Sequence, residues 1–103
     1  MQNIEIQLIN EKEQIIEKCS INFAPVLELY WNSKLSENEY PFLSTIDPYG
    51  NTYYNVFQVK KIITELEKLS KNKDVTDVLE ISREVINFLR KVRQHTYAKF
   101  IGD

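Results

Sequence analysis

The side chains that most often carry out catalysis are scarce in this chain. It has one histidine, His95, and one cysteine, Cys19, far apart in the sequence. Nucleophilic catalysis and transition-metal binding both favour such groups in local combinations, and no combination is present. A lone histidine near a helix end more often interacts with the last carbonyl groups of that helix. We therefore predict no catalytic residue and no metal site.

The closely spaced carboxylates do not change this interpretation. Glu11 with Glu13, and Glu65 with Glu67, lie in strongly polar stretches. We expect them on the surface, where neither desolvation nor a fixed partner would tune a pKa for acid–base work. The chain also has only two glycines, too few for a phosphate-binding loop. The sequence thus predicts a protein that is not an enzyme and holds no cofactor.

A turn between residues 47 and 50 is the most distinctive local feature. Asp47, Pro48 and Gly50 occupy the positions that a type I turn favours, because the aspartate bonds the backbone and the proline fixes φ. Asn55 and Gln58 follow with the spacing of a helix capping box. We assign these five residues structural roles.

The same segment leaves a second interpretation open. Asp47, Asn51 and Asn55 would surround a polar pocket if their side chains converged, as in a small ligand-binding or enzymatic domain. Their separation or their use in turn and cap bonds would remove this alternative.

Tyrosines are concentrated around the turn. Four of the six lie between residues 40 and 54: Tyr40, Tyr49, Tyr53 and Tyr54. Tyrosines on a rigid turn give a large contact area at low entropic cost, but they can equally form a small core over a sheet. We predict that Tyr49 is more exposed than Tyr54. Tyr49, Asn51 and Tyr53 are candidates for contacts with a partner.

The elements that position these residues are visible in the hydrophobic pattern. Ile4, Ile6 and Leu8 alternate with polar residues and predict a strand over residues 2–9, with residues 14–19 returning as a second strand. Residues 97–101 are short and partly alternating, and are expected to add an edge strand to this hairpin.

Three helices are predicted from apolar residues at helical spacing. The first covers residues 23–33, with Asn22 as its cap and a stripe that includes Tyr30 and Trp31. The second begins at the Asn55 capping box, with Tyr54 and Val59 as a hydrophobic staple. The third spans residues 75–92 with Asp74 as its cap.

These elements predict a single two-layer α+β domain over residues 1–103, in which the hairpin packs on three helices. The expected core consists of Ile4, Ile6, Leu8, Phe23, Val26, Leu27, Val59, Ile62, Ile63, Leu66, Val85, Ile86 and Leu89.

Charge is unevenly distributed along the chain. Residues 1–50 contain eight acidic residues and three lysines, whereas residues 51–103 contain ten basic and seven acidic residues. An acidic half is compatible with a basic protein partner that binds at Glu11, Glu13 and Glu17, although solvated faces also explain it. The basic residues are interspersed with acidic ones, which argues against nucleic acid. The absence of a long apolar run and the lone cysteine predict a cytoplasmic protein that does not enter a membrane.

Several segments resemble a family of small uncharacterised bacterial proteins. They are the segment from Pro41 to Thr52, which contains the Ile46-Asp47-Pro48-Tyr49-Gly50-Asn51-Thr52 loop, then residues 55–58, residues 65–69 and the ending from His95 to Phe100-Ile101-Gly102-Asp103. The family pairs an IDPYG-[DN]-T loop with an FIGD ending, and the resemblance implies no catalytic residues. Asn51 stands where Asp is also common, which weakens any metal-binding role there.

The small size and acidic character also resemble immunity proteins, which neutralise bacterial toxins. The leading interpretation is therefore a non-enzymatic cytoplasmic immunity protein that binds a toxin domain encoded nearby.

Overall fold

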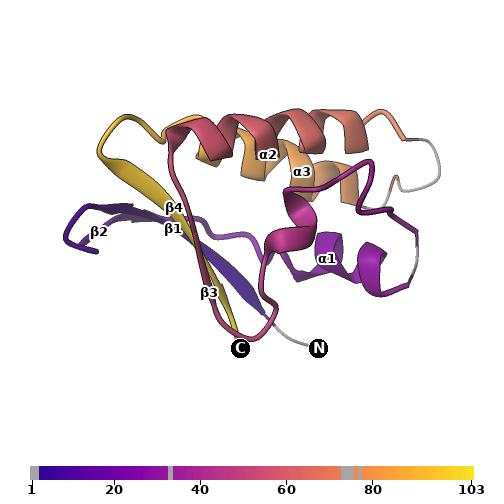
Figure 1. The fold of residues 1–103 in the computed structure, drawn as a ribbon, viewed down its shortest axis with the longest axis horizontal. Coiled ribbons are helices and arrows are strands. Elements are labelled where there is room, and N and C mark those ends of the chain that lie inside the picture. The colour runs from indigo at the N-terminus through magenta and orange to yellow at the C-terminus, as the bar shows by residue number, and fades with distance from the viewer. Residues whose placement is uncertain (1–2, 33, 73–75, 77) are drawn as a thin grey trace.

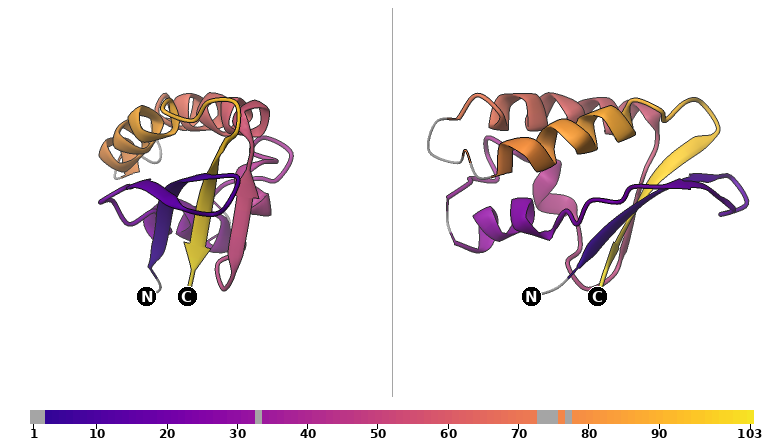
Figure 2. Two further views of the ribbon diagram at one scale, coloured as in Figure 1. Left: turned by 90° about the vertical axis from the view of Figure 1, so that its left-hand side faces the viewer. Right: turned by 180° about the vertical axis from the view of Figure 1, so that it is seen from behind.

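The computed structural model describes residues 3–32, 34–72, 76 and 78–103. Its strands form an antiparallel sheet in the order β2-β1-β4-β3. The three α-helices lie on one side of this sheet (Figure 1), and the opposite side faces the viewer in Figure 2, left. This two-layer α+β arrangement confirms the predicted fold class. Its elements are β1 (Ile4–Asn10), β2 (Ile15–Lys18), α1 (Ala24–Trp31), the short 3-10 helix η1 (Leu43–Thr45), β3 (Asn51–Tyr54), α2 (Val56–Leu69), α3 (Leu79–Leu89) and β4 (Thr96–Gly102).

The C-terminal strand lies in the interior of the sheet. It joins the hairpin as predicted, because Ile6 pairs with Phe100 and Leu8 with Ala98. However, it is not an edge strand, since β3 pairs with its other side and Thr52 lies opposite Phe100. The sequence predicts a loop at residues 51–54, because four residues after a turn show too little alternation to predict a strand. Only the pairing with β4 makes them one.

The boundaries of two helices differ from the predictions. α3 ends at Leu89 rather than at residue 92, and the N-cap residue of α1 is Phe23 rather than Asn22. The Asn22 Oδ1 atom nevertheless accepts hydrogen bonds from Ala24 N and Ile4 N, both at 2.9 Å. Asn22 thus ties the start of α1 to β1. Residues 33, 74 and 75, at the predicted ends of the first and third helices, lie outside the described residues.

The start of α2 has the geometry that the sequence predicts. Asn55 Oδ1 accepts from Gln58 N at 2.9 Å, and Gln58 Oε1 accepts from Asn55 N at the same distance. Tyr54 and Val59, on either side of this capping box, are both buried in the core.

The core lies between the sheet and the helices. Phe100 is at its centre, where its ring makes edge contacts with Phe23 and Tyr54 at 5.5 Å between ring centroids. Of the predicted core residues only Ile63 is half-buried, and it packs against the rest. The buried predicted residues are Ile4, Ile6, Leu8, Phe23, Val26, Leu27, Val59, Ile62, Leu66, Val85, Ile86 and Leu89.

Candidate functional site

The turn from Asp47 to Gly50 is fixed by contacts on both of its arms. Asp47 Oδ1 accepts a hydrogen bond from Tyr49 N, and Asp47 N donates to Thr52 Oγ1, each at 2.9 Å. The other arm lies against the end of β4, where Gly102 N donates to Gly50 O at 2.8 Å. A Cβ atom on Gly102 would lie 2.3 Å from Pro48 O, so only glycine allows this approach.

The two segments with distinctive sequences therefore form one structural unit. Gly50 has no positive φ, but a Cβ atom there would lie 2.6 Å from Asp47 Oδ2. Both glycines are needed for space rather than for a special backbone conformation. The unit presents Tyr49 at its tip with 73% of the residue exposed.

The four clustered tyrosines divide into two pairs. Tyr40 and Tyr54 are buried, and Tyr49 and Tyr53 are exposed. Tyr54 lies in the core as predicted, with its hydroxyl 2.7 Å from Thr45 Oγ1, and burial raises the pKa of its phenol. The core interpretation thus applies to Tyr40 and Tyr54, whereas partner contacts of Tyr49 and Tyr53 stay a prediction.

The three predicted glutamates of the β1–β2 hairpin each lie beside a basic residue from the other half of the chain. Glu17 pairs with Lys91, and Glu11 Oε1 lies 3.1 Å from His95 Nδ1. Glu13 Oε1 lies 3.4 Å from Lys99 Nζ. The hairpin therefore presents carboxylates that already have partners.

Glu13 is also linked to one of the exposed tyrosines. The Tyr53 hydroxyl donates to Glu13 Oε1 at 2.6 Å. This hydrogen bond, followed by the contact with Lys99, holds the pKa of the Glu13 carboxyl below its ordinary value. Tyr53 belongs to the edge strand β3, whereas Glu13 lies in the loop that joins β1 and β2 near the other edge of the sheet. The β1–β2 loop therefore reaches across the side of the sheet that faces away from the helices (Figure 2, left).

The structure does not bring Asp47, Asn51 and Asn55 together around a pocket. Asp47 holds the turn and Asn55 caps α2. Asn51 is exposed at the end of β3 opposite to Asn55. The described pockets are lined by other residues.

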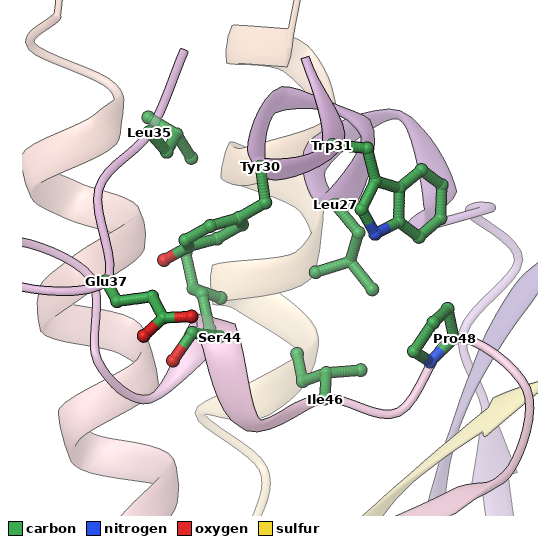
Figure 3. A pocket seen from close by; sticks show the side chains of 9 residues that line it. Leu27, Tyr30, Trp31, Leu35, Glu37, Ser44, Ile46 and Pro48 are labelled. Atoms are coloured by element: carbon green, nitrogen blue, oxygen red, sulfur yellow. The ribbon is translucent and has the colours of Figure 1, made fainter. Parts of the chain in front are cut away.

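A pocket of about 410 Å³ opens between α1 and the segment from η1 to Pro48. Figure 3 shows its organisation: the Glu37 carboxylate, the Tyr30 hydroxyl and Ser44 lie at one end, and Trp31 and Pro48 at the other. Leu27 and Ile46 lie between these ends. Leu35 and Leu43 complete the lining, in which Glu37 is the charged residue. Trp31 belongs to the apolar stripe that the sequence predicts for the first helix, but 46% of this residue is exposed.

A buried carboxylate holds one wall of this pocket. Glu65 of α2 is 7% exposed, and its two oxygens accept from Phe42 N and Leu43 N at 2.9 Å each. The expectation that Glu65 lies on the surface is therefore wrong. A signal for its burial exists in the sequence, since Ile62, Glu65 and Leu69 share one face of a helix.

The opposite wall is held by Tyr30 of α1, whose hydroxyl donates to Tyr40 O. Burial raises the pKa of this phenol, and the nearby carboxylates of Glu65 and Glu37 act in the same direction. Tyr30 is therefore a neutral donor that is already engaged.

The charges near the pocket differ from those of the hairpin. Residues 20–50 contain Glu28, Glu37, Glu39 and Asp47 but one basic residue, Lys34. Glu39 lies 3.6 Å from Lys68, whereas the other three acidic residues form no salt bridge within the described part of the chain. Among the described residues, acidic side chains without a salt bridge therefore lie on the elements that border the pocket.

Comparisons with protein-family models, with curated proteins and with solved structures found no significant match to this chain. The resemblance of the loop and the ending to a bacterial family stays a prediction. Among the described residues no helix is long and apolar enough to cross a membrane. Nor do these residues contain a group of three or more His, Cys, Asp or Glu side chains suited to a metal ion.

Proposed function

We propose that this chain is a non-enzymatic binding protein that occupies a basic protein partner. We further propose that the partner is a bacterial toxin domain encoded nearby, so that the chain acts as an immunity protein in the cytoplasm. The observation that carries the proposal is Tyr49, which is 73% exposed on a turn that Asp47 and Gly102 hold in place. A large aromatic side chain on a rigid support is typical of an interface anchor, because little entropy is lost when it is covered.

Two further observations support a protein partner. Three acidic residues that form no salt bridge with a described residue, Glu28, Glu37 and Asp47, lie in the segment that leads to Tyr49, and they favour a partner of positive charge. An exposed tryptophan, Trp31, lines a pocket together with Pro48, the residue directly before Tyr49. Tryptophan and tyrosine are the residues most enriched among interface anchors.

The test is co-expression with the products of neighbouring genes. We expect one of them to be toxic alone, to form a stoichiometric complex with this chain and to lose its toxicity in that complex. Tyr49→Ala should weaken the complex by about 30-fold, the equivalent of about 2 kcal/mol, without lowering the melting temperature.

Phe57→Ala is the matched control, because Phe57 is also an exposed aromatic residue, 71% exposed, but follows the other end of β3. It should leave the affinity unchanged. The proposal fails if no neighbouring gene product binds, and full affinity of the Tyr49→Ala variant would move the interface away from the turn.

A further inference from the structure

We infer that the pocket beside α1 receives a basic segment of the protein partner, with an arginine or lysine side chain at Glu37 and an adjacent apolar side chain against Trp31 and Pro48. The inference rests on the proposed binding function, but it names residues other than Tyr49 and can fail separately from it.

The shape of the pocket fits an elongated side chain that is apolar along its length and charged at its end. Its volume of about 410 Å³ is in the range of sites that enclose part of a ligand. Leu27 and Ile46 form the stretch between the Glu37 end and the Trp31 end (Figure 3). The methylene groups of arginine or lysine pack well on such a surface while the cation reaches a polar group.

Glu37 is the group in the pocket that remains available for a charged ligand. The Tyr30 hydroxyl donates to Tyr40 O and the Ser44 hydroxyl donates to Pro41 O at 2.6 Å, so both are used within the fold. The Glu37 carboxylate, by contrast, forms no hydrogen bond or salt bridge with any residue that the structure describes. A carboxylate accepts hydrogen bonds only, and its charge favours a cation over a neutral donor.

The surroundings favour the same sign of charge. Glu28 and Asp47, on the elements that border the pocket, also form no salt bridge within the described ranges. An acidic partner segment would meet uncompensated like charges, whereas a basic segment is attracted from a distance.

Trp31 supplies the second contact. The indole is 46% exposed and lies beside Pro48 at the end of the pocket away from Glu37 (Figure 3). An indole face attracts a guanidinium group or packs against an aliphatic side chain, and either contact gains from removal from water. Leu27, Leu43 and Ile46, which line the rest of the pocket, are buried in the core, so the site requires little rearrangement to bind.

The experiment uses the full chain and a phage-displayed library of random linear peptides as the probe. We expect the selected peptides to carry arginine or lysine next to a large apolar residue. Glu37→Gln and Trp31→Ala should each lower the affinity for a synthetic copy of a selected peptide by about tenfold or more. Glu37→Arg should change the selection to peptides with an acidic residue in place of the basic one.

Glu17→Gln is the matched control, because Glu17 is an exposed carboxylate that Lys91 already neutralises. It should leave peptide affinity unchanged. Trp31 and Glu37 are exposed, so their variants should melt as the parent does. If Trp31→Ala does not fold, Trp31→Phe, which keeps an aromatic side chain, takes its place in the affinity measurement.

The inference is overturned if no peptide sequence is enriched or if the enriched peptides are acidic or uncharged. It is also overturned if Glu17→Gln lowers the affinity for the selected peptides as strongly as Glu37→Gln does. A toxin complex that is insensitive to Glu37→Gln and Trp31→Ala would refute the pocket inference and leave the proposed function intact. Selected peptides that need Glu37, together with no complex between this chain and a neighbouring gene product, would refute the function and leave the pocket inference intact.

Discussion

The β1–β2 hairpin and the segment from α1 to β3 contain the same number of acidic residues but differ in how many of these are paired. Residues 1–19 and residues 20–50 each contain four acidic residues. In the hairpin, Glu11, Glu13 and Glu17 meet His95, Lys99 and Lys91, respectively. In the second segment, Glu39 alone has a cationic partner among the described residues.

The difference shows that the charge of a segment does not give the charge of the surface that it forms. The basic residues that pair with the hairpin glutamates come from the loop after α3 and from β4. The antiparallel pairing of β1 with β4 brings these parts of the chain next to the hairpin. No strand pairs with the described residues from α1 to η1, and of the acidic residues there Glu28 and Glu37 form no salt bridge with a described residue. The folded structure therefore favours the pocket region over the hairpin as the binding surface.

The largest effect is expected at a residue that supports both regions. Leu66 of α2 is fully buried in the core. Leu66→Ala should lower the free energy of unfolding by about 2–5 kcal/mol, through lost burial and the cavity left behind. A denaturant melt measures this, and a change within about 0.5 kcal/mol would show that the inner face of α2 is assigned wrongly.

The next effect separates the two regions. Glu65→Ala removes the carboxylate that accepts hydrogen bonds from Phe42 N and Leu43 N. The free energy of unfolding should fall by about 3 kcal/mol, because two partly or fully buried amides lose their charged partner. Hydrogen exchange should increase in residues 42–46 and stay unchanged in the hairpin.

Glu67→Ala is the control for this experiment, since Glu67 is exposed and its contact with Arg90 is a surface ion pair. It should cost less than about 1 kcal/mol. Equal losses for the two variants would contradict the role assigned to Glu65.

A smaller effect concerns the unit that carries Tyr49. Gly102→Ala would place a Cβ atom 2.3 Å from the backbone oxygen of Pro48, and should cost about 1–3 kcal/mol because backbone must move. In Gly50→Ala the new Cβ atom would contact the Asp47 side chain, which can rotate away. This rotation breaks one hydrogen bond and should lower the free energy of unfolding by about 1 kcal/mol. Denaturant melts of both variants test this order, and a larger loss for Gly50→Ala would reverse the account of the turn.

The smallest expected effect is a change in titration on the hairpin side. Tyr53→Phe removes the hydrogen bond that contributes most to the lowered pKa of Glu13, so this pKa should rise towards its ordinary value. A lowered pKa in the folded state stabilises the fold above the ordinary pKa, and that contribution is lost as the pH falls through the lowered value. The variant should therefore lose less stability on acidification than the parent does.

An NMR titration of the Glu13 carboxyl carbon measures this pKa directly. Tyr49→Phe, at the exposed tyrosine of the turn, should leave it unchanged. A Glu13 pKa that is the same in Tyr53→Phe and the parent would show that the bond across the sheet does not persist in solution.

The sequence predicts the elements whose periodicity is strong and local. Alternation placed β1, apolar stripes placed the helices, and the spacing of Asn55 and Gln58 placed the start of α2. Each of these signals lies within a few residues and depends on the geometry of one element.

The features that the sequence did not predict all depend on contacts between distant segments. β3 is a strand because β4 pairs with it, and Glu65 is buried because η1 supplies two amides. The pocket forms where α1 meets the segment around Pro48, so no local pattern marks Trp31 and Glu37 as neighbours. The pairing of the hairpin glutamates was missed for the same reason, because their cations lie in the other half of the chain.

The central claim is that a partner binds at the pocket region rather than at the hairpin. Trp31 is the only tryptophan of the chain, so 5-fluorotryptophan labelling places a single ¹⁹F resonance at the pocket. Addition of the unlabelled toxin domain in stoichiometric amount should shift this resonance, and Glu37→Gln should reduce the affinity read from the titration. A complex that forms by calorimetry while the Trp31 resonance keeps its position, and that Glu17→Gln weakens instead, would contradict the account.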